Sequence, residues 1–368
     1  MKLNYSTTNN AAAGRIEEID VARGIAIISV IIGHLVWAEG FLYGFIYSFH
    51  MPIFFLLSGY CSKLHRKEVK FFPYLIKHIK TLLIPCFIFK VILILTKISV
   101  FESWSETVTA LFFSPTLEWF CPVIFLSGIV LWFYHLIVKR LESLTNSKIV
   151  ALLLLITFIG IVPSLVDFYA EQGYHGTEPL IVRLDSCLIA TTFVLLGYHL
   201  YEMNALQRIK TAVLDLRKGS FVVLIVLLFG VSAPFIYNNS YVNVYDASLG
   251  KSDLLFYYLA LLGSFYCIAF SCKIVSMQNS LCDIIKNTLI FMGRHSLYFY
   301  FGHGIVFQMY HKILIRFFNK DWWPMADQWG IRLKTFYFLS SIVILIPLLK
   351  MWDYILLRIK ERLQYYRK

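Results

Sequence analysis

Long apolar runs constrain this chain more than any other feature. They recur from residue 22 almost to residue 351 and are separated only by short polar connections. A helix needs about 20 apolar residues to cross the hydrocarbon core of a bilayer. Because 58% of the 368 residues are hydrophobic and only 15% are charged, no stretch is left for a separate soluble domain. We therefore predict an all-α integral membrane protein with one domain over residues 1–368.

The apolar runs predict a polytopic bundle of about ten transmembrane helices. The expected spans are 20–38, 45–62, 81–99, 118–138, 149–166, 180–200, 220–237, 254–272, 295–314 and 335–352. A short segment, 1–19, precedes them, and a basic tail, 353–368, follows them. The polar start lacks the apolar core of a cleavable signal, so we expect the first run to remain as a helix of the protein.

Lysine and arginine residues predict the orientation. They gather in every second connection, as in RKEVKFFPYLIKHIK at 66–80, whereas connections such as DFYAEQGYHGTEP at 167–179 contain none. Positive loops face the cytoplasm, so both termini are expected there. The segment 66–80 is either a purely topogenic cluster or a helix on the anionic inner leaflet. The net charge of +12 comes from these clusters, and nucleic acid is not an expected partner.

Arginine and histidine occur together in the first apolar run, DVARGIAIISVIIGHLVW at 20–37. At about 100° per residue, the steps from Arg23 to His34 complete about three turns, so both side chains share one face, about 16 Å apart along the axis. Asp20 precedes Arg23 by one turn on that face. Ionisable groups are costly against lipid, so this face should point into the bundle or a hydrated cavity. Arg23 alone would also fit a helix end, with its charge reaching the interface.

A second histidine lies in the next run, in SFHMPIFFLLSGY at 48–60. In a helical hairpin with its turn near Leu42, His34 and His50 lie equally far from the turn, so we expect them at one depth in the outward half of the membrane. For each, a structural role with a satisfied hydrogen bond stays open. Acid–base chemistry is the more economical role for a histidine near neutral pH.

A metal site is not expected. These spans offer no obvious third carboxylate or thiolate ligand at the depth of the two histidines, and the HExxH spacing is missing. The seven cysteines are odd in number and lack CxxC spacing, so neither a disulfide framework nor a structural zinc is expected.

Motifs spread over nearly the whole chain carry a family resemblance. RGIAIISVIIGH has an Arg-x10-His pattern, and YSFHMPIFFLLSGY and a basic stretch ending in LLIP follow it. Further along are EWFCPVIFLSG at 118–128, RLDSCLIATTFVLLGYHLY at 183–201 and GRHSLYFYFGH at 293–303. In this combination the chain resembles the membrane-bound acyltransferase family 3, and within it the group around fucose 4-O-acetylase.

The resemblance implies transfer of an acyl group, usually acetyl from acetyl-CoA, to a sugar hydroxyl of a surface or exported polysaccharide or glycolipid. It implies that His34 is the general base and that Arg23 lies near the donor, which is a substrate and not a permanently bound cofactor. The chemistry agrees, because a thioester is already activated whereas a sugar hydroxyl needs a base. The basic edge from Lys63 to Lys80, which begins with Lys63 and Arg66, would attract anionic CoA. His50 either assists His34 or only bonds across the hairpin.

Other polar residues in or beside apolar runs are candidates for acceptor binding. They are Asp20, Trp119, Arg183, Asp185, Ser296, Tyr300 and His303. Arg183 and Asp185 could bind a sugar or form an ion pair. Trp119 could stack on a sugar or belong to an interfacial aromatic belt. The last three residues recur at spacings of four and three, so they share one helix face, which could complete the polar track formed by Asp20, Arg23, His34 and His50.

The apolar runs predict a multi-pass membrane protein, and the family resemblance implies that it is an O-acetyltransferase of the bacterial cytoplasmic (inner) membrane. Its expected partners are the lipid bilayer, acetyl-CoA and a glycan or glycolipid acceptor. The alternative is a transporter or exporter of a glycan or lipid-linked sugar, which would also need many spans and a polar track. The chain shows no internal repeat, and this counts modestly against transport. A non-catalytic scaffold would leave the alignment of Asp20, Arg23, His34 and His50 unexplained.

Overall fold

The computed structural model describes residues 15–35, 40–64, 70–97, 119–145, 149–171, 183–239, 241–318 and 331–365. Within these ranges the chain is almost entirely helical, and the only β-type pairing is an isolated bridge between Asn243 and Ser248. The helices of the first half are α1 (Glu17–Gly33), α2 (Phe41–Leu64), α3 (Phe71–His78), the π-helix η1 (Ile79–Leu83), α4 (Ile84–Lys97), α6 (Phe120–Thr145) and α7 (Ile149–Glu171). Those of the second half are α8 (Leu184–Glu202), α9 (Ala205–Asp215), α10 (Lys218–Asn238), the 3-10 helix η3 (Val244–Asp246), α11 (Asp253–Ser276), α12 (Ser280–Arg294), α13 (Ser296–Phe318) and α14 (Ile331–Tyr365).

Six helical stretches in the described ranges are long and apolar enough to cross a membrane. They are Phe41–Ser62, Phe71–Leu95, Phe120–Thr145, Leu184–Glu202, Gly219–Asn238 and Asp253–Ser276. Each overlaps one of the predicted spans. The all-helical, multi-pass membrane fold is thus confirmed, whereas the count of about ten spans and the cytoplasmic position of both termini stay predictions.

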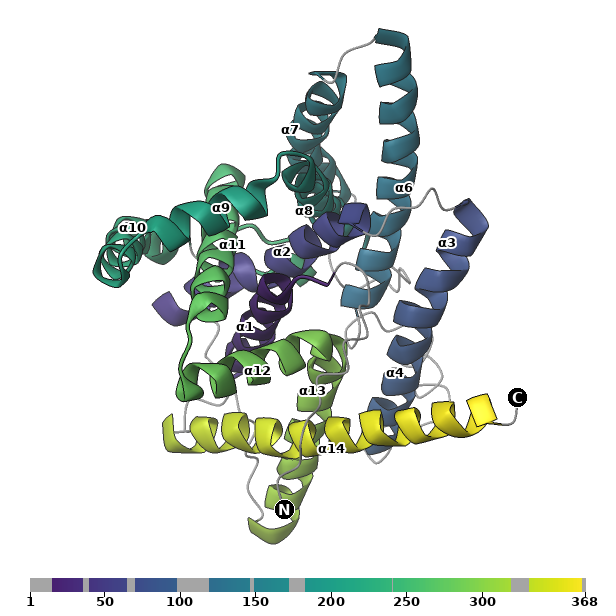
Figure 1. Cartoon of the computed structure of the whole chain (residues 1–368), viewed down its shortest axis with the longest axis vertical. Coiled ribbons are helices and arrows are strands. Elements are labelled where there is room, and N and C mark those ends of the chain that lie inside the picture. Colours follow the sequence, from purple (N-terminus) through teal and green to yellow (C-terminus); the bar gives the residue numbers. More distant parts are fainter. Residues whose placement is uncertain are drawn as a thin grey trace.

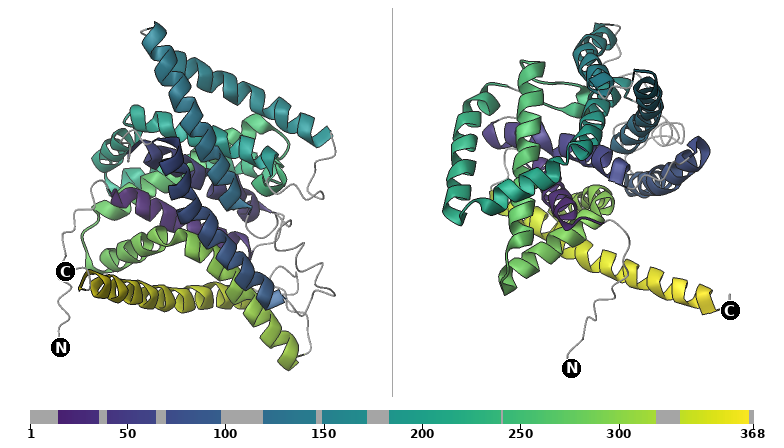
Figure 2. Two further views of the ribbon diagram at one scale, coloured as in Figure 1. Left: turned by 90° about the vertical axis from the view of Figure 1, so that its right-hand side faces the viewer. Right: turned by 45° about the horizontal axis from the view of Figure 1, so that its top comes forward.

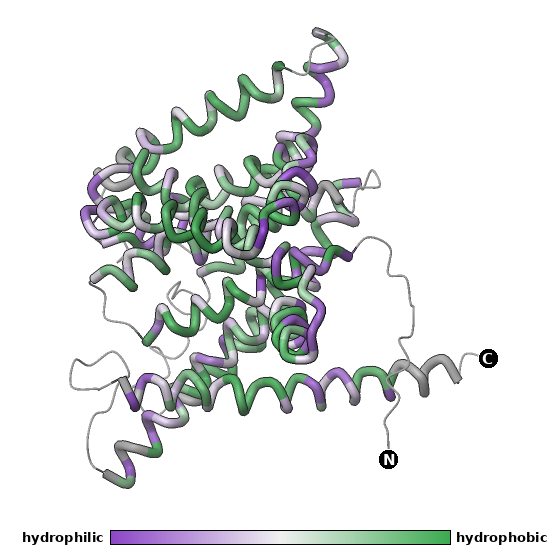
Figure 3. Tube along the Cα trace, turned by 60° about the vertical axis from the view of Figure 1, so that its left-hand side comes forward, coloured by the Kyte–Doolittle hydropathy of each residue, from purple (hydrophilic) through white to green (hydrophobic). Residues whose placement is uncertain are grey.

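Burial separates inner helices from outer ones. In α2, 67% of the apolar window is buried inside the chain, against 17% in α10. Exposed valine and leucine side chains, such as Val226 and Leu227, line α10, and Figure 3 shows apolar residues along most of the helical tube. An exposed apolar helix face of this kind fits contact with lipid chains.

The helix α1 lies near the centre of the molecule, between α2, α11 and α12 (Figure 1). Glycines allow its closest contact, because a Cβ atom at Gly24 would collide with the Leu289 carbonyl of α12 and one at Gly293 with the Asp20 carbonyl of α1. The helices α2 and α8 use Gly59 and Gly197 in the same way. Small residues of this kind let membrane helices pack backbone against backbone.

The edges of the molecule are less tightly packed. The helices α6 and α7 meet at a tip of the molecule, and α14 lies across another end, where its C-terminal part projects beyond the neighbouring helices (Figures 1 and 2). Residues 351–359 of α14 are all exposed.

Two helix boundaries differ from the predicted ones. The helix α1 ends at Gly33, so His34 is its C-cap residue, whereas the sequence placed His34 well inside the span. The third span was expected from residue 81, but the helix begins at Phe71 and continues through η1 into α4. Pro73 is compatible with this early start, because a first helical turn does not need the backbone N–H that proline lacks. The Tyr74 hydroxyl donates to the Gly128 carbonyl at 2.9 Å and holds α3 against α6.

Candidate functional site

Two histidines from distant parts of the chain meet at one end of α1. The ring centroids of His34, at the C-cap of α1, and His303, in α13, are 5.1 Å apart. His303 is buried, whereas His34 is exposed, and its imidazole makes no hydrogen bond to any described residue. An accessible imidazole with open ring nitrogens has the freedom that a general base needs.

The third histidine of this group is His50 in α2. Gly33, next to His34, lies against the side chains of Ile46 and Tyr47 in the first turns of α2. The Tyr47 ring, which lies against Gly33, is 4.7 Å from the ring of His50, so His50 lies near the end of α1 that carries His34. The structure thus brings together His34, His50 and His303, which we call the histidine cluster.

Backbone carbonyls fix the tautomers of the two buried rings. Nδ1 of His50 is 2.7 Å from the Ile46 carbonyl oxygen, and Nδ1 of His303 is 2.9 Å from that of Phe299. A carbonyl oxygen only accepts, so each Nδ1 carries the proton and donates it. In the neutral ring Nε2 is then the basic nitrogen, which can accept a hydrogen bond or a proton.

A stack of aromatic rings connects His50 with the segment before η3. The Tyr47 ring packs edge-on to His50 at 4.7 Å and stacks on Tyr43 at 4.0 Å. Tyr43 in turn stacks on Tyr241 at 5.8 Å and donates its hydroxyl proton to the Val242 carbonyl at 3.0 Å. These contacts hold the ring of His50 in a defined orientation.

A cavity of about 560 Å³ lies at the other end of α1, between α1, α2, α3 and α6. Its wall includes Arg23, whose Nη2 donates to the Cys61 sulfur at 3.6 Å. The wall also includes the cations Lys70, Lys77 and Lys139 and the rings of Tyr74, His78, Trp132 and His135. We call this space the cationic cavity. It is large enough for a small-molecule ligand, and its charge and aromatic rings suit an anionic ligand with a flat ring system.

Of Arg23, Lys63 and Arg66, the residues predicted to bind the donor, the structure places Arg23 at the cationic cavity. Arg23 faces the cationic cavity, but His34 is not part of its wall and lies about 16 Å further along the α1 axis. Lys63 belongs to the last turn of α2, and its side chain lies outside the described part of the structure, as does Arg66. Lys77 belongs to the basic edge from Lys63 to Lys80 that was expected to attract CoA. Lys139 and Trp132 were not among the predicted donor residues, because nothing in the sequence relates them to 66–80.

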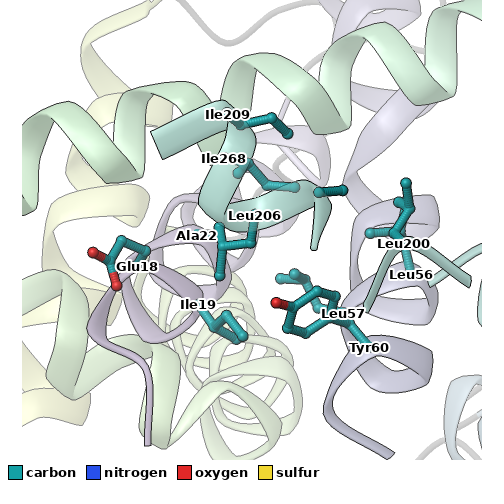
Figure 4. A pocket seen from close by; sticks show the side chains of 11 residues that line it. Glu18, Ile19, Ala22, Leu56, Leu57, Tyr60, Leu200, Leu206, Ile209 and Ile268 are labelled. Carbon is teal, nitrogen blue, oxygen red and sulfur yellow. The ribbon is translucent and has the colours of Figure 1, made fainter. Parts of the chain in front are cut away.

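Asp20 is buried in ion pairs. Its carboxylate is 3.0 Å from Nε of Arg294 and 3.6 Å from Nε of Arg15, so it joins α1 to α12. A neighbouring carboxylate, Glu18, pairs with Lys210 of α9 at 2.6 Å, and this hydrogen bond raises the pKa of the lysine. Figure 4 shows the apolar hollow beside Glu18, which at about 20 Å³ holds roughly one water molecule.

The remaining predicted residues fall into two places. Arg183 and Asp185 form a buried ion pair at 2.7 Å at the start of α8, and Trp119 lies close by at the start of α6, with its ring 5.8 Å from that of Tyr245. In α13, Tyr300 lies 6.4 Å from His303, whereas Ser296 is at the first residue of the helix, two turns from His303. The part of the chain that the structure describes contains no group of three histidine, cysteine or acidic residues that could hold a metal ion.

Fold and site together define a polytopic helical membrane protein with a histidine cluster at one end of α1 and a cationic cavity at the other. The family model of the acyltransferase domain, Acyl_transf_3, matches residues 16–350. The chain therefore belongs to the acyltransferase 3 family, and it is a membrane acyltransferase. No curated protein and no solved structure shows significant similarity to it.

Proposed function

We propose that this acyltransferase moves an acetyl group from acetyl-CoA to a sugar hydroxyl of a surface or exported polysaccharide or glycolipid. The observation that carries the proposal is the arrangement along α1, which presents Arg23 to a cationic cavity and His34 to a cluster of histidines. The Arg23 end of α1 suits an anionic donor, and the His34 end suits proton transfer. The sequence resemblance to the fucose 4-O-acetylase group supports a sugar as acceptor.

The donor would bind through its charged end. Coenzyme A carries phosphates and an adenine ring. In the cationic cavity, Lys70, Lys77 and Lys139 would pair with the phosphates, and Trp132 would stack on the adenine. The flexible pantetheine arm would run along α1 from Arg23 toward His34 and carry the thioester to the histidines. In this arrangement CoA binds at one end of α1 and the acyl group is transferred at the other.

In the transfer step, His34 takes the proton of the acceptor hydroxyl as its oxygen attacks the thioester carbonyl. A C–O bond forms, and the tetrahedral intermediate then breaks its C–S bond. The products are the sugar ester and the CoA thiolate, which takes up the proton that His34 accepted. His50 and His303 would orient His34 and the acceptor, because their Nε2 atoms can accept hydrogen bonds.

The proposal places the protein in the cytoplasmic membrane of a bacterium, with CoA entering from the cytoplasm. Lysine and arginine clusters of the sequence support this orientation, and the cations of the cavity belong to the same side as Arg23. The histidine cluster lies toward the opposite side, where an exported glycan is accessible.

Chemical analysis of surface glycans tests the function. Cells that carry the wild-type protein should contain an O-acetyl ester that disappears when the protein is deleted or carries His34→Ala. The matched control is His295→Ala, a histidine between α12 and α13, about two turns before His303, that pairs with Asp353 at 3.0 Å; it should keep the ester. Unchanged glycan acetylation with His34→Ala, at equal amounts of protein in the membrane, would overturn the mechanism. Loss of glycan export without loss of an ester would instead favour a transporter.

A further inference from the structure

The guanidinium of Arg183 has one hydrogen-bonding group left over. Its Nε and Nη2 donate to the two carboxylate oxygens of Asp185 at 3.1 and 2.7 Å. The remaining nitrogen, Nη1, is buried and makes no hydrogen bond of good geometry, and the residue as a whole is only 6% exposed. Besides Asp185, the polar side chain that interacts with the guanidinium is Tyr245. An unpartnered buried donor is costly, so most such groups in folded proteins have a partner.

The missing partner is best supplied by a neutral oxygen. Asp185 already neutralises the charge of Arg183 through two parallel hydrogen bonds. A second anion would therefore meet little net positive charge, whereas a hydroxyl or ether oxygen needs only the free N–H. Sugars offer many oxygens of this kind.

Aromatic rings surround the same place. The Arg183 guanidinium lies 4.8 Å from the ring centroid of Tyr245, and Trp119 lies 5.8 Å from Tyr245. The Ser186 hydroxyl donates to the Tyr245 carbonyl at 3.0 Å and fixes η3 against α8. Burial raises the pKa of the Tyr245 phenol, so the phenol stays a neutral hydrogen-bond donor. Aromatic faces with a few fixed polar groups are the usual lining of a small-molecule site.

This place is connected to the histidine cluster but does not touch it. Trp119 contacts Phe120 at 6.3 Å, Phe120 contacts Tyr300 at 5.4 Å, and Tyr300 contacts His303 at 6.4 Å. No direct ring contact joins Trp119 or Tyr245 to His34 or His303 among the described residues. The ring contacts that link Trp119 to His303 thus pass through two further rings, those of Phe120 and Tyr300.

We propose that Arg183, Trp119 and Tyr245 form a subsite for a sugar unit other than the one that is acylated, so that the acceptor is an oligosaccharide or glycan chain and not a free monosaccharide. The inference rests on the proposed function, which places the reacting hydroxyl at His34. The Trp119 ring stacks on this remote sugar, and Nη1 of Arg183 donates to one of its oxygens.

The test compares acceptors of different length. Glycan is released from cells that lack the protein and is separated into size fractions, and its constituent monosaccharides are prepared by full hydrolysis. The purified protein in detergent is assayed with acetyl-CoA and each fraction, and binding of the same fractions is measured without donor. We expect kcat/KM to rise by about tenfold or more from monosaccharides to oligosaccharides, because the subsite adds contacts that a single unit cannot make.

Variants of the subsite test whether it causes the higher kcat/KM of oligosaccharides. Trp119→Ala should remove the advantage of oligosaccharides in KM and in binding and leave kcat unchanged, and Trp119→Phe should restore part of it. Arg183→Lys keeps a cation beside Asp185 but lacks Nη1, and it should weaken oligosaccharide binding by roughly five- to tenfold. Trp352→Ala, a change at an exposed tryptophan of α14, is the matched control and should behave as the wild type.

Two results would overturn the subsite. One is equal binding and equal kcat/KM for monosaccharides and oligosaccharides, and the other is an unchanged length preference in Trp119→Ala. Failure of the proposed function looks different, because the wild type would then move no acetyl group from acetyl-CoA to any fraction. In that case the donor-free binding measurement still decides the subsite, through the difference between wild type and Trp119→Ala.

Discussion

The imidazole rings of His34 and His303 lie 5.1 Å apart, although one belongs to the first helix of the chain and the other to the second-last helix described. This contact joins the N-terminal pair of helices, which carries His34 and His50, to α13. The acid–base end of the site therefore depends on the whole bundle, and each of its parts makes a separate experimental prediction.

Substitution of His303 should affect transfer and spare donor binding. His303→Ala removes a buried imidazole from beside His34, far from the cationic cavity, so we expect kcat for transfer to fall by about 10²-fold with little change in KM for acetyl-CoA. Steady-state kinetics of the purified variant measure both constants, with His295→Ala as the control. A rise in KM for acetyl-CoA with unchanged kcat would show that His303 serves the donor and not the chemistry.

The cations of the cavity should govern donor affinity. In the Lys77→Gln, Lys139→Gln double variant, two charges are lost from the wall that faces the CoA phosphates, so KM for acetyl-CoA should rise by roughly tenfold and its dependence on salt should weaken. Lys251→Gln, at an exposed position before α11, is the matched control and should leave KM unchanged. An unaltered KM in the double variant would contradict CoA binding in this cavity.

The carboxylate of Asp20 should matter for stability more than for substrate binding. Asp20→Asn weakens the bonds to Arg294 and Arg15, and because the arginines are partly exposed we expect a loss of about 1–2 kcal/mol in the free energy of unfolding. The apparent melting temperature in detergent measures this loss. Arg294→Gln should lower it by a similar amount, and the two changes together by less than their sum. If Asp20→Asn instead leaves the melting temperature unchanged and raises KM for the acceptor, then Asp20 serves substrate binding.

The close contact of α2 and α8 should be intolerant of a single methyl group. In Gly59→Ala, the new Cβ atom meets the Val194 carbonyl oxygen of α8, so the helices must separate, at a cost of about 1–3 kcal/mol. Gly160→Ala in α7, where nothing lies within 4 Å of the added atom, is the matched control, and its melting temperature should stay equal or rise slightly. Equal melting temperatures for the two variants would mean that α2 and α8 are packed less closely than described.

Much of the fold was predictable from the sequence, because an apolar run of membrane-spanning length has no other low-energy form in a bilayer. Boundaries were less predictable. The sequence placed His34 within a span that continued to residue 38, whereas α1 ends at Gly33, and hydropathy does not signal that end. Likewise, the basic residues before residue 81 concealed that the helix begins at Phe71.

The candidate site was predictable where residues share one helix or one hairpin. Helical periodicity relates Arg23 to His34, and hairpin length relates His34 to His50. Contacts between helices far apart in sequence were not predictable, because periodicity gives the inward face of a helix but not its neighbour. The place of Lys139 in the cationic cavity is of this kind. The face that carries His303 was expected to complete the polar track, but its direct ring contact with His34 was not predicted.

The most direct measurement of the central claim follows the acetyl group itself. The purified protein is incubated in detergent with acetyl-CoA labelled in the acetyl group and with glycan from cells that lack the protein. We predict that the wild type transfers the label to the glycan as an alkali-labile ester, and that His34→Ala transfers at least about 10²-fold less while it still binds acetyl-CoA. Equal transfer by wild type and His34→Ala, or no transfer by a folded wild type that binds both substrates, would contradict the account.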